Sequence, residues 1–535
     1  MSRVPAALFA VLLACAGVAQ PAAARHPWTV PHVLRLADVA DPDSLNPLLS
    51  TMDLSYDLSS LVFSYLVIAK RDGTLTGDLA TEVPGVANGG VSRDGRVYTY
   101  HLRRNVVWHD GVPLTSRDVA FSWRAIMSPR NSVLHREGYE EVQSIATPDD
   151  RTVVVHLRCR YPPFVTQFFT TLQEGAKPVV PEHLLGRETS IDEASYNAHP
   201  VGSGPFRFVR WDRGTRLVLE RNDRYFKGRP KLDRIELTIV PDENTMETEL
   251  RTHELDMPVS SSAVLWSHVR GVPGLATRLD PWNSETLLAL DNARPALRDV
   301  RVRRAIAEAI DYGAIIHKLT FDTATVATDV VAPGSLGFAK NAAYRYDPAH
   351  AKAMLEQAGW HAGPDGTRAK DGATLDLVIV VASQGAGPLY AVQLQRMLLD
   401  VGIRVTIKTY PYKGIYAYDG PIVTGRYDLA IYANTLPYDP DRTTTLGCGE
   451  FTPKGMNEFR FCDRALDALE REGLATDDVR QRAALYRKAG ARIHAVVPYI
   501  PLFLRQRPSV MNDDLRGYDP SPVAASWWNA WQWDV

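Results

Sequence analysis

The 535-residue sequence predicts an exported α/β protein of several domains. Hydrophobic residues make up 45% of the chain and charged residues 23%, which is ordinary for globular proteins. At roughly 100 to 200 residues per domain, this length corresponds to two to four domains. Strand and helix patterns alternate in the C-terminal half, and one apolar segment lies at the extreme N-terminus. The formal charge of −2 gives no electrostatic indication of a nucleic-acid-binding surface.

The N-terminal segment has the pattern of a signal peptide, expected at residues 1–25. Arg3 supplies a positive charge, residues 5–14 form an apolar core, and the alanines at 22–24 suit cleavage. The apolar run is short for a helix that spans a bilayer. We therefore expect the mature chain to begin near Arg25 or His26, outside the cytoplasm.

The four cysteines fit an oxidising compartment. Cys15 ends the segment Leu-Leu-Ala-Cys, which resembles a lipoprotein box, so acylation and membrane anchoring stay open. Cys448 and Cys462 are 14 positions apart and can form a disulfide there. Cys159 is then expected to be a buried free thiol at the end of a strand. No cysteine has the flanking CxxC or paired histidine spacing of a metal site.

Strand patterns predict a small α+β unit in the first 200 residues. Residues 97–102 and 153–157 are rich in β-branched and aromatic side chains, which is typical of strands. Between them, Thr115 followed by Asp118 has the spacing of a capping box and predicts the start of a helix through Phe121, Trp123 and Ile126. Two further strands are expected at residues 216–220 and 234–240.

The C-terminal half is expected to form a separate α/β domain. Asp299 and Asp347 each precede a segment with apolar residues at helical spacing, so each predicts the start of a helix. Residues 375–381, 388–400 and 403–409 follow as strand, helix and strand, a unit that should cross over right-handed into parallel pairing. A further strand is expected at residues 427–432.

Signatures of catalysis are absent from the sequence. There is no HExxH motif and no Walker loop, and Gly-Ser-Gly at 202–204 lacks the third glycine of a dinucleotide-binding loop. His109 beside Asp110 fits a turn better than an acid-base pair, because adjacent residues in a turn rarely face each other. The sequence therefore predicts no catalytic residue, no metal site and no cofactor.

Aromatic side chains are the more informative class. The chain has 11 tryptophans, 22 tyrosines and 15 phenylalanines, many of them near turns. Large faces with a polar edge suit a ligand cleft between domains, although core packing and carbohydrate stacking use the same residue types. The candidates are Trp282, Tyr410, Tyr412, Tyr416, Tyr418, Tyr432, Tyr438 and the tail at 527–533.

Several short segments resemble one known family. In order, they are Asp-Ser-Leu-Asn-Pro at 43–47, Val-Trp-His-Asp-Gly at 107–111, Asp-Val-Ala-Phe-Ser-Trp at 118–123, Val-Pro-Glu-His-Leu at 180–184, Gly-Ser-Gly-Pro-Phe at 202–206 and Asp-Val-Arg-Val-Arg-Arg-Ala-Ile at 299–306. They resemble the bacterial extracellular solute-binding family for peptides, nickel and oligopeptides, whose members serve ABC importers.

The resemblance implies an α/β, two-lobe periplasmic-binding-protein fold of type II with an extra small α+β domain. Two lobes would close on a cleft about a hinge, and the ligand would favour the closed form. Lobe I would take residues 28–65, 200–285 and 505–535, the extra domain residues 66–199, and lobe II residues 286–504.

The resemblance also implies a set of ligand contacts. By position, they are Thr51, Asp53, Ser260, Ser261, Trp282, Tyr432, Asn434, Thr435, Tyr438 and Asp439. Peptide-binding relatives carry an aspartate for the ligand's amino terminus just upstream of the step matching Asp439-Pro440, whereas this chain has Thr-Leu-Pro at 435–437. A buried ammonium without a carboxylate partner is costly. Either Asp53, Asp439 or Asp441 supplies the charge, or the ligand is not a free-amine peptide.

The function implied is that of a monomeric periplasmic receptor, not an enzyme. It would capture a peptide or peptide-like solute and deliver it to an ABC permease in the inner membrane, with no nucleic-acid partner. Two alternatives stay open: a binder of another solute in the same family, such as a sugar or a metal chelate, and a secreted hydrolase of peptides or glycans.

Overall fold

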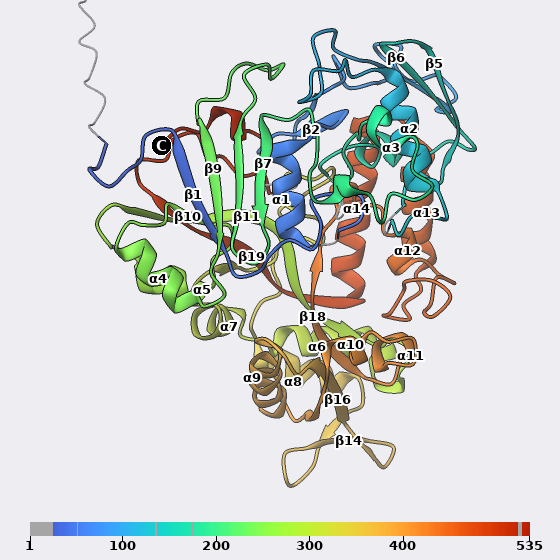
Figure 1. Ribbon diagram of the computed structural model, residues 1–535. Helices are drawn as coiled ribbons and strands as arrows, with labels where there is room; N and C mark the ends of the chain where they lie inside the picture. The colour runs from blue at the N-terminus through green and yellow to red at the C-terminus, as the bar shows by residue number, and fades with distance from the viewer. Residues whose placement is uncertain (1–24, 51, 134–135, 173–175, 523–526) are drawn as a thin grey trace, which may run out of the picture.

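The computed structural model describes residues 25–50, 52–133, 136–172, 176–522 and 527–535. The expected signal peptide, except for its last residue, and Cys15 lie outside the described residues. No helix within these described ranges is long and apolar enough to cross a membrane. Figure 1 shows one body around the strands β1, β7 and β9, a smaller unit around α2 and β5, and a second body that contains α6, α8 and α9.

The first body, here called lobe I, is built on a five-stranded sheet in the order β10-β1-β9-β8-β7. β1 pairs in parallel with β9 and β10, whereas β7, β8 and β9 pair antiparallel. The expected strands at 216–220 and 234–240 are confirmed as β8 and β9. The elements are β1 (Val33–Asp38), α1 (Asp53–Val62), β7 (Phe206–Asp212), β8 (Arg216–Arg221), β9 (Arg234–Ile239), α4 (Glu243–Arg251), β10 (Met257–Pro258) and α5 (Ala263–Val269).

The extra domain contains an antiparallel sheet in the order β4-β6-β5, with α2 packed against it. Asp118 accepts a hydrogen bond from the backbone N–H of Thr115 at 2.7 Å, so the predicted start of α2 is confirmed. One continuous hydrophobic core joins this domain to lobe I. The elements are β2 (Val67–Ala69), β3 (Leu75–Gly77), β4 (Val97–His101), α2 (Ser116–Met127), β5 (Val142–Asp149), β6 (Thr152–Leu157) and α3 (Glu182–Leu185).

The second body, here called lobe II, is built on a six-stranded sheet in the order β12-β19-β11-β18-β16-β17. β16 pairs in parallel with β17, as the strand-helix-strand pattern predicted, and also with β18. The strands are β11 (Leu275–Leu290), β12 (Ala324–Thr325), β16 (Asp376–Ala382), β17 (Arg404–Tyr410), β18 (Leu429–Thr435) and β19 (Tyr499–Asn512), and β13 (His361–Ala362), β14 (Arg368–Lys370) and β15 (Ala373–Thr374) form a small separate sheet.

Helices cover both faces of the six-stranded sheet and bury a separate core on each face. The side chains of Asp299 and Asp347 accept backbone N–H bonds at the starts of α6 and α8, which confirms both predicted caps. The helices are α6 (Val300–Glu308), α7 (Tyr312–Leu319), α8 (Pro348–Gln357), α9 (Gly387–Leu399), α10 (Tyr412–Ile415), α11 (Pro421–Thr424), α12 (Thr443–Leu446), α13 (Arg464–Leu474) and α14 (Val479–Val496).

Two long antiparallel strands connect the lobes. The N-terminal part of β11 pairs with the C-terminal part of β19 beside lobe I, and the same two strands pair again inside the lobe II sheet. Their register shifts between Pro281 and Glu285, where the ladder is interrupted by an irregularity. The domain boundaries expected from the sequence remain predictions.

The cysteines differ from expectation in one respect. Cys448 and Cys462 form the expected disulfide. Cys159 is free but exposed, so the expectation of a buried thiol is wrong. The reason is that β6 ends at Leu157, and Cys159 lies beyond the last residue that alternates into the core.

We expect the double variant Cys448→Ser/Cys462→Ser to lose about 3 kcal/mol of unfolding free energy, because the disulfide restricts a loop of 14 positions in the unfolded chain. Guanidinium unfolding monitored by circular dichroism measures the loss. Cys159→Ser is the matched control and should leave the midpoint unchanged, since that side chain is exposed. A double variant as stable as the wild type would contradict the expectation.

Candidate ligand-binding site

A cavity of about 580 Å³ lies where lobe I meets lobe II. Lobe I contributes the end of β1, the start of α1 and the segment between β10 and α5. Lobe II contributes the end of α7, β12 and the start of α9. β11 and β19, which connect the lobes, complete the wall with Trp282, Phe503 and residues 505–508.

Three carboxylates line the lobe I side of this cavity: Asp38, Asp53 and Asp57. Asp38 is the last residue of β1, and its carboxylate accepts the backbone N–H of Ala40 at 3.0 Å. Burial raises the pKa of Asp38 above its ordinary value, and the backbone hydrogen bonds oppose that rise. Asp53 opens α1 and is exposed to the cavity.

Two arginines on β19 line the same cavity and bring positive charge to it. Arg505 and Arg507 are two positions apart, so their side chains share one face of the strand. Their guanidinium carbons lie 4.7 and 5.3 Å from the ring centre of Trp282, within the range of cation–π contact. Arg507 lies 3.9 Å from the Asp57 carboxylate.

Arg505 is the cation in this cavity that is available to a ligand. Among the described residues, its guanidinium donates no hydrogen bond and has no carboxylate within 4.0 Å. Desolvation lowers the pKa of Arg505, while Tyr390 and Asp53 oppose that effect. Arg505 is exposed, and a cation without an anionic partner favours the binding of a carboxylate.

Serines supply neutral hydrogen-bonding groups between β10 and α5. Ser260, Ser261 and Ser262 all line the cavity. The hydroxyl of Ser262 is already engaged, since it accepts the backbone N–H of Leu265 at the start of α5 and donates to Glu243. Ser260 and Ser261 precede that cap, on the open side of the segment.

A smaller cavity of about 280 Å³ lies on one face of the lobe II sheet. Tyr412, Tyr416 and Tyr432 form an aromatic wall, with ring centres 5.4 and 6.1 Å apart in edge-to-face pairs. The hydroxyl of Tyr432 donates to Glu458 at 2.7 Å. This cavity shares no residue with the larger one.

Buried polar atoms lie at the base of the smaller cavity. Arg442 and Tyr499 line it, and Glu285 lies behind Asn434, whose amide nitrogen is 3.5 Å from one carboxyl oxygen of Glu285. Burial raises the pKa of Glu285 to about 7, against the opposing effect of Arg442. Within the described residues, Oε2 of Glu285, Nε of Arg442 and Oη of Tyr499 have no hydrogen-bond partner. Such atoms are costly to bury unpaired, so this cavity favours a polar occupant.

The residues expected from the sequence fall into three groups. Asp53, Ser260, Ser261 and Trp282 line the larger cavity, and Tyr432 and Asn434 line the smaller one. Thr435, Tyr438 and Asp439 line neither, and Thr51 lies outside the described residues.

Two of these residues have structural partners instead. The hydroxyl of Tyr438 donates to the backbone carbonyl of Gly73 at 3.0 Å, next to the extra domain. Asp439 is only 7% exposed and accepts two hydrogen bonds from Nη2 of Arg482, at 2.9 and 3.1 Å. Of the three carboxylates considered for a ligand ammonium, the structure places Asp53 in the cavity and Asp439 and Asp441 outside its lining.

Sequence reasoning missed Asp38, Asp57, Arg505 and Arg507. Arg505 and Arg507 carry a signal in retrospect, since two arginines alternate directly after the apolar run at 499–504. The aromatic tail was an expected cleft component, but Trp527 and Trp533 are buried in the core shared by lobe I and the extra domain.

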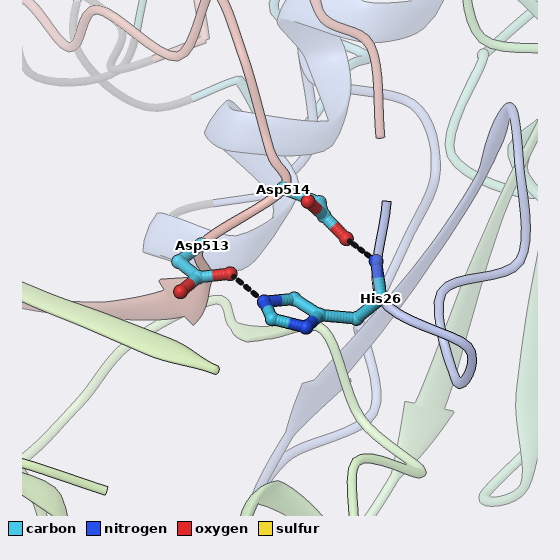
Figure 2. A group of neighbouring side chains, drawn as sticks. All are labelled: His26, Asp513 and Asp514. Atoms are coloured by element: carbon cyan, nitrogen blue, oxygen red, sulfur yellow. Dashed lines mark hydrogen bonds and ion pairs between the residues drawn. The ribbon is translucent and has the colours of Figure 1, made fainter. Parts of the chain in front are cut away.

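One group of potential metal ligands among the described residues lines neither cavity: His26, Asp513 and Asp514 (Figure 2). Nε2 of His26 lies 2.8 Å from Asp513, and the backbone N–H of His26 donates to Asp514 at 2.7 Å. Asp514 also accepts the hydroxyl of Thr29 at 2.7 Å. These bonds fasten the N-terminal segment to the chain that follows β19.

Comparison with known proteins identifies the fold. Residues 74–449 match the family of bacterial extracellular solute-binding proteins, family 5 Middle. The chain belongs to this family. Its α/β, two-lobe periplasmic-binding-protein fold is thereby confirmed.

Relatives of this family member match almost its whole length. The di/tripeptide-binding protein 2 of Pseudomonas aeruginosa is 28% identical, over 92% of this chain and 94% of its own. An oligopeptide-binding protein of Bacillus subtilis is 25% identical, over 93% of this chain and 91% of its own. The periplasmic binding protein of Helicobacter pylori, solved with the peptide STSA, is 25% identical with a TM-score of 0.71, over 94% of this chain and 97% of its own.

The variant Asp439→Asn separates a ligand role from an ion-pair role. Removing the carboxylate leaves Arg482 buried without its partner, so we expect a loss of about 3 to 5 kcal/mol in unfolding stability. Calorimetric affinity for a bound peptide should stay unchanged, because Asp439 does not line the cavity. Weaker binding by a variant with native stability would instead return Asp439 to the ligand site.

Proposed function

We propose that this solute-binding protein captures a peptide or peptide-like solute with free termini between its lobes. The observation that carries the proposal is the pair of opposite anchors in one cavity: Asp53 on lobe I and Arg505 on β19. A zwitterionic peptide presents an ammonium and a carboxylate at its two ends. Each end then meets a charge of the opposite sign in a partly desolvated space.

The remaining lining suits a peptide backbone. Ser260 and Ser261 offer hydroxyls for its amides, and Trp282 offers an aromatic face beside the carboxylate anchor. The smaller cavity provides a second space for a polar side chain or a longer ligand. The names of the relatives support this solute class, since they bind di/tripeptides, oligopeptides and the peptide STSA.

The protein acts by binding and release rather than by catalysis. The lobes close about β11 and β19, and the solute favours the closed form because it contacts both walls. The receptor works as a periplasmic monomer and hands its solute to an ABC permease in the inner membrane. The large cavity contains no histidine or cysteine among its described lining residues, so its chemistry favours a carboxylate-bearing solute over a bare metal ion.

Native mass spectrometry of protein purified from its own periplasm tests the function directly. We expect a co-purified mass that matches a peptide, and small-angle scattering should show compaction when a peptide mixture is added to stripped protein. Release of cleaved products would identify a hydrolase instead. A co-purified sugar or metal chelate would keep the receptor role and replace the solute.

Variants at the two anchors test the orientation of the peptide. Arg505→Gln should weaken binding of a free-acid peptide by about 10- to 100-fold, because a charge-assisted hydrogen bond is lost. The same substitution should hardly change the already weaker binding of the C-terminal amide. Asp53→Asn should likewise weaken binding of a free-amine peptide and hardly change the already weaker binding of the N-acetylated peptide. Arg505→Lys should retain part of the wild-type affinity for the free-acid peptide.

Isothermal titration calorimetry measures the affinity of the wild type and of each variant for the unmodified, the C-terminally amidated and the N-acetylated peptide. Equal losses for the free acid and the amide would show that Arg505 does not hold the carboxylate.

A further inference from the structure

A strongly basic depression of about 840 Å³ lies on lobe II and shares no residue with either cavity described above. Helices α6 and α8, the C-terminal end of α14 and residues 460–463 at the end of the disulfide loop form its walls. We call it the arginine groove. Its arginines are Arg298, Arg301, Arg303, Arg304, Arg460 and Arg492.

Part of this cluster has a structural role at the end of α14. Arg303 donates to the carbonyls of Val497 at 2.8 Å and Leu297 at 2.7 Å, and Arg304 donates to Ala495 at 2.8 Å. The last carbonyls of a helix have no partner within the helix, so these guanidinium groups satisfy them. The helix end offers only about half of an elementary negative charge in return.

Carboxylates neutralise only a minority of the arginines. Asp299 pairs with Arg301 at 2.6 Å, and Asp463 pairs with Arg492 at 2.6 Å. Among the described residues, the other four arginines of the groove have no carboxylate within 4.0 Å. The groove therefore keeps a local positive charge, although the formal net charge of the whole chain is −2.

The two most accessible of these side chains also have unused donors. Arg298 is exposed, and within the described chain only its Nε donates, to the carbonyl of Ala293 at 3.1 Å. Arg304 is exposed and donates through Nε and Nη2 to a single carbonyl, which leaves Nη1 to the solvent side. Arg303 is only 5% exposed, so a fixed buried charge lies beneath them.

We propose that the arginine groove binds a phosphate-type oxyanion. Planar guanidinium groups match phosphate oxygens in a two-pronged geometry, and several of them around one depression reinforce each other. Inorganic phosphate and the headgroup of an anionic phospholipid present the same chemistry. An exported protein encounters both, so the source is decided by experiment.

Calorimetry with inorganic phosphate at constant ionic strength tests the site on the full mature chain. Sedimentation with phosphatidylglycerol/phosphatidylcholine vesicles, against phosphatidylcholine alone, tests the lipid source. Arg298→Gln/Arg304→Gln should weaken whichever ligand binds by about tenfold, because unused donors and two charges are removed. Arg117→Gln/Arg187→Gln, at exposed arginines of the extra domain, is the control with the same change of charge.

The single variant Arg298→Gln keeps the test valid if the double variant is unstable, since its side chain makes only one hydrogen bond to a carbonyl. Binding of phosphate alone supports a free anion as ligand, and retention on anionic vesicles supports a lipid headgroup. The proposal is overturned if the wild type binds neither probe, or if the groove variants bind as tightly as the control. Because the cavity residues are untouched, peptide affinity should be the same in every variant.

Discussion

The pairing of β11 with β19 is the constraint on which the rest of the structure depends. These two strands run between the lobes, and their residues enter the cores of both: Val510 packs in lobe I, and Leu288 and Leu502 pack in lobe II. The register of the ladder shifts between Pro281 and Glu285, where Trp282 lies, and again between Thr286 and Leu287. A connection with irregularities at its centre can bend there.

The same interruption also shapes the larger cavity. Trp282 on β11 faces Arg505 and Arg507 on β19, so the connection between the lobes forms one wall of the cavity. Any rotation of the lobes therefore moves the acidic wall of lobe I relative to these cations. In the proposed function, closure of the lobes therefore also changes the electrostatic match to the solute, because Asp53 and Arg505 lie on different walls of the cavity.

Lobe II also contacts the extra domain, away from the hinge. The hydroxyl of Tyr438 donates to the carbonyl of Gly73. Arg160 of the extra domain pairs at 2.5 Å with Asp477, a residue of the loop between α13 and α14. Since the extra domain shares its core with lobe I, these contacts add to the bonds that a separation of the lobes must break. The Arg482–Asp439 pair lies nearby and holds the turn after β18 against α14. Residues at this turn therefore stabilise the arrangement of the lobes rather than fill the cavity.

The sequence by itself determined the local elements and the family. Capping side chains such as Asp299 and Asp347, and the strand-helix-strand order before β18, depend on neighbours within a few residues, so the pattern contains them. Family motifs also located Asp53, Ser260 and Trp282 near the ligand space. Only the tertiary structure decided which charges meet there. Arg505 and Asp53, some 450 positions apart in the chain, line the same cavity. Asp439 pairs with Arg482 instead of lining that cavity, and Cys159 is exposed because its strand ends early. Such outcomes depend on contacts between distant segments, and no local periodicity encodes them.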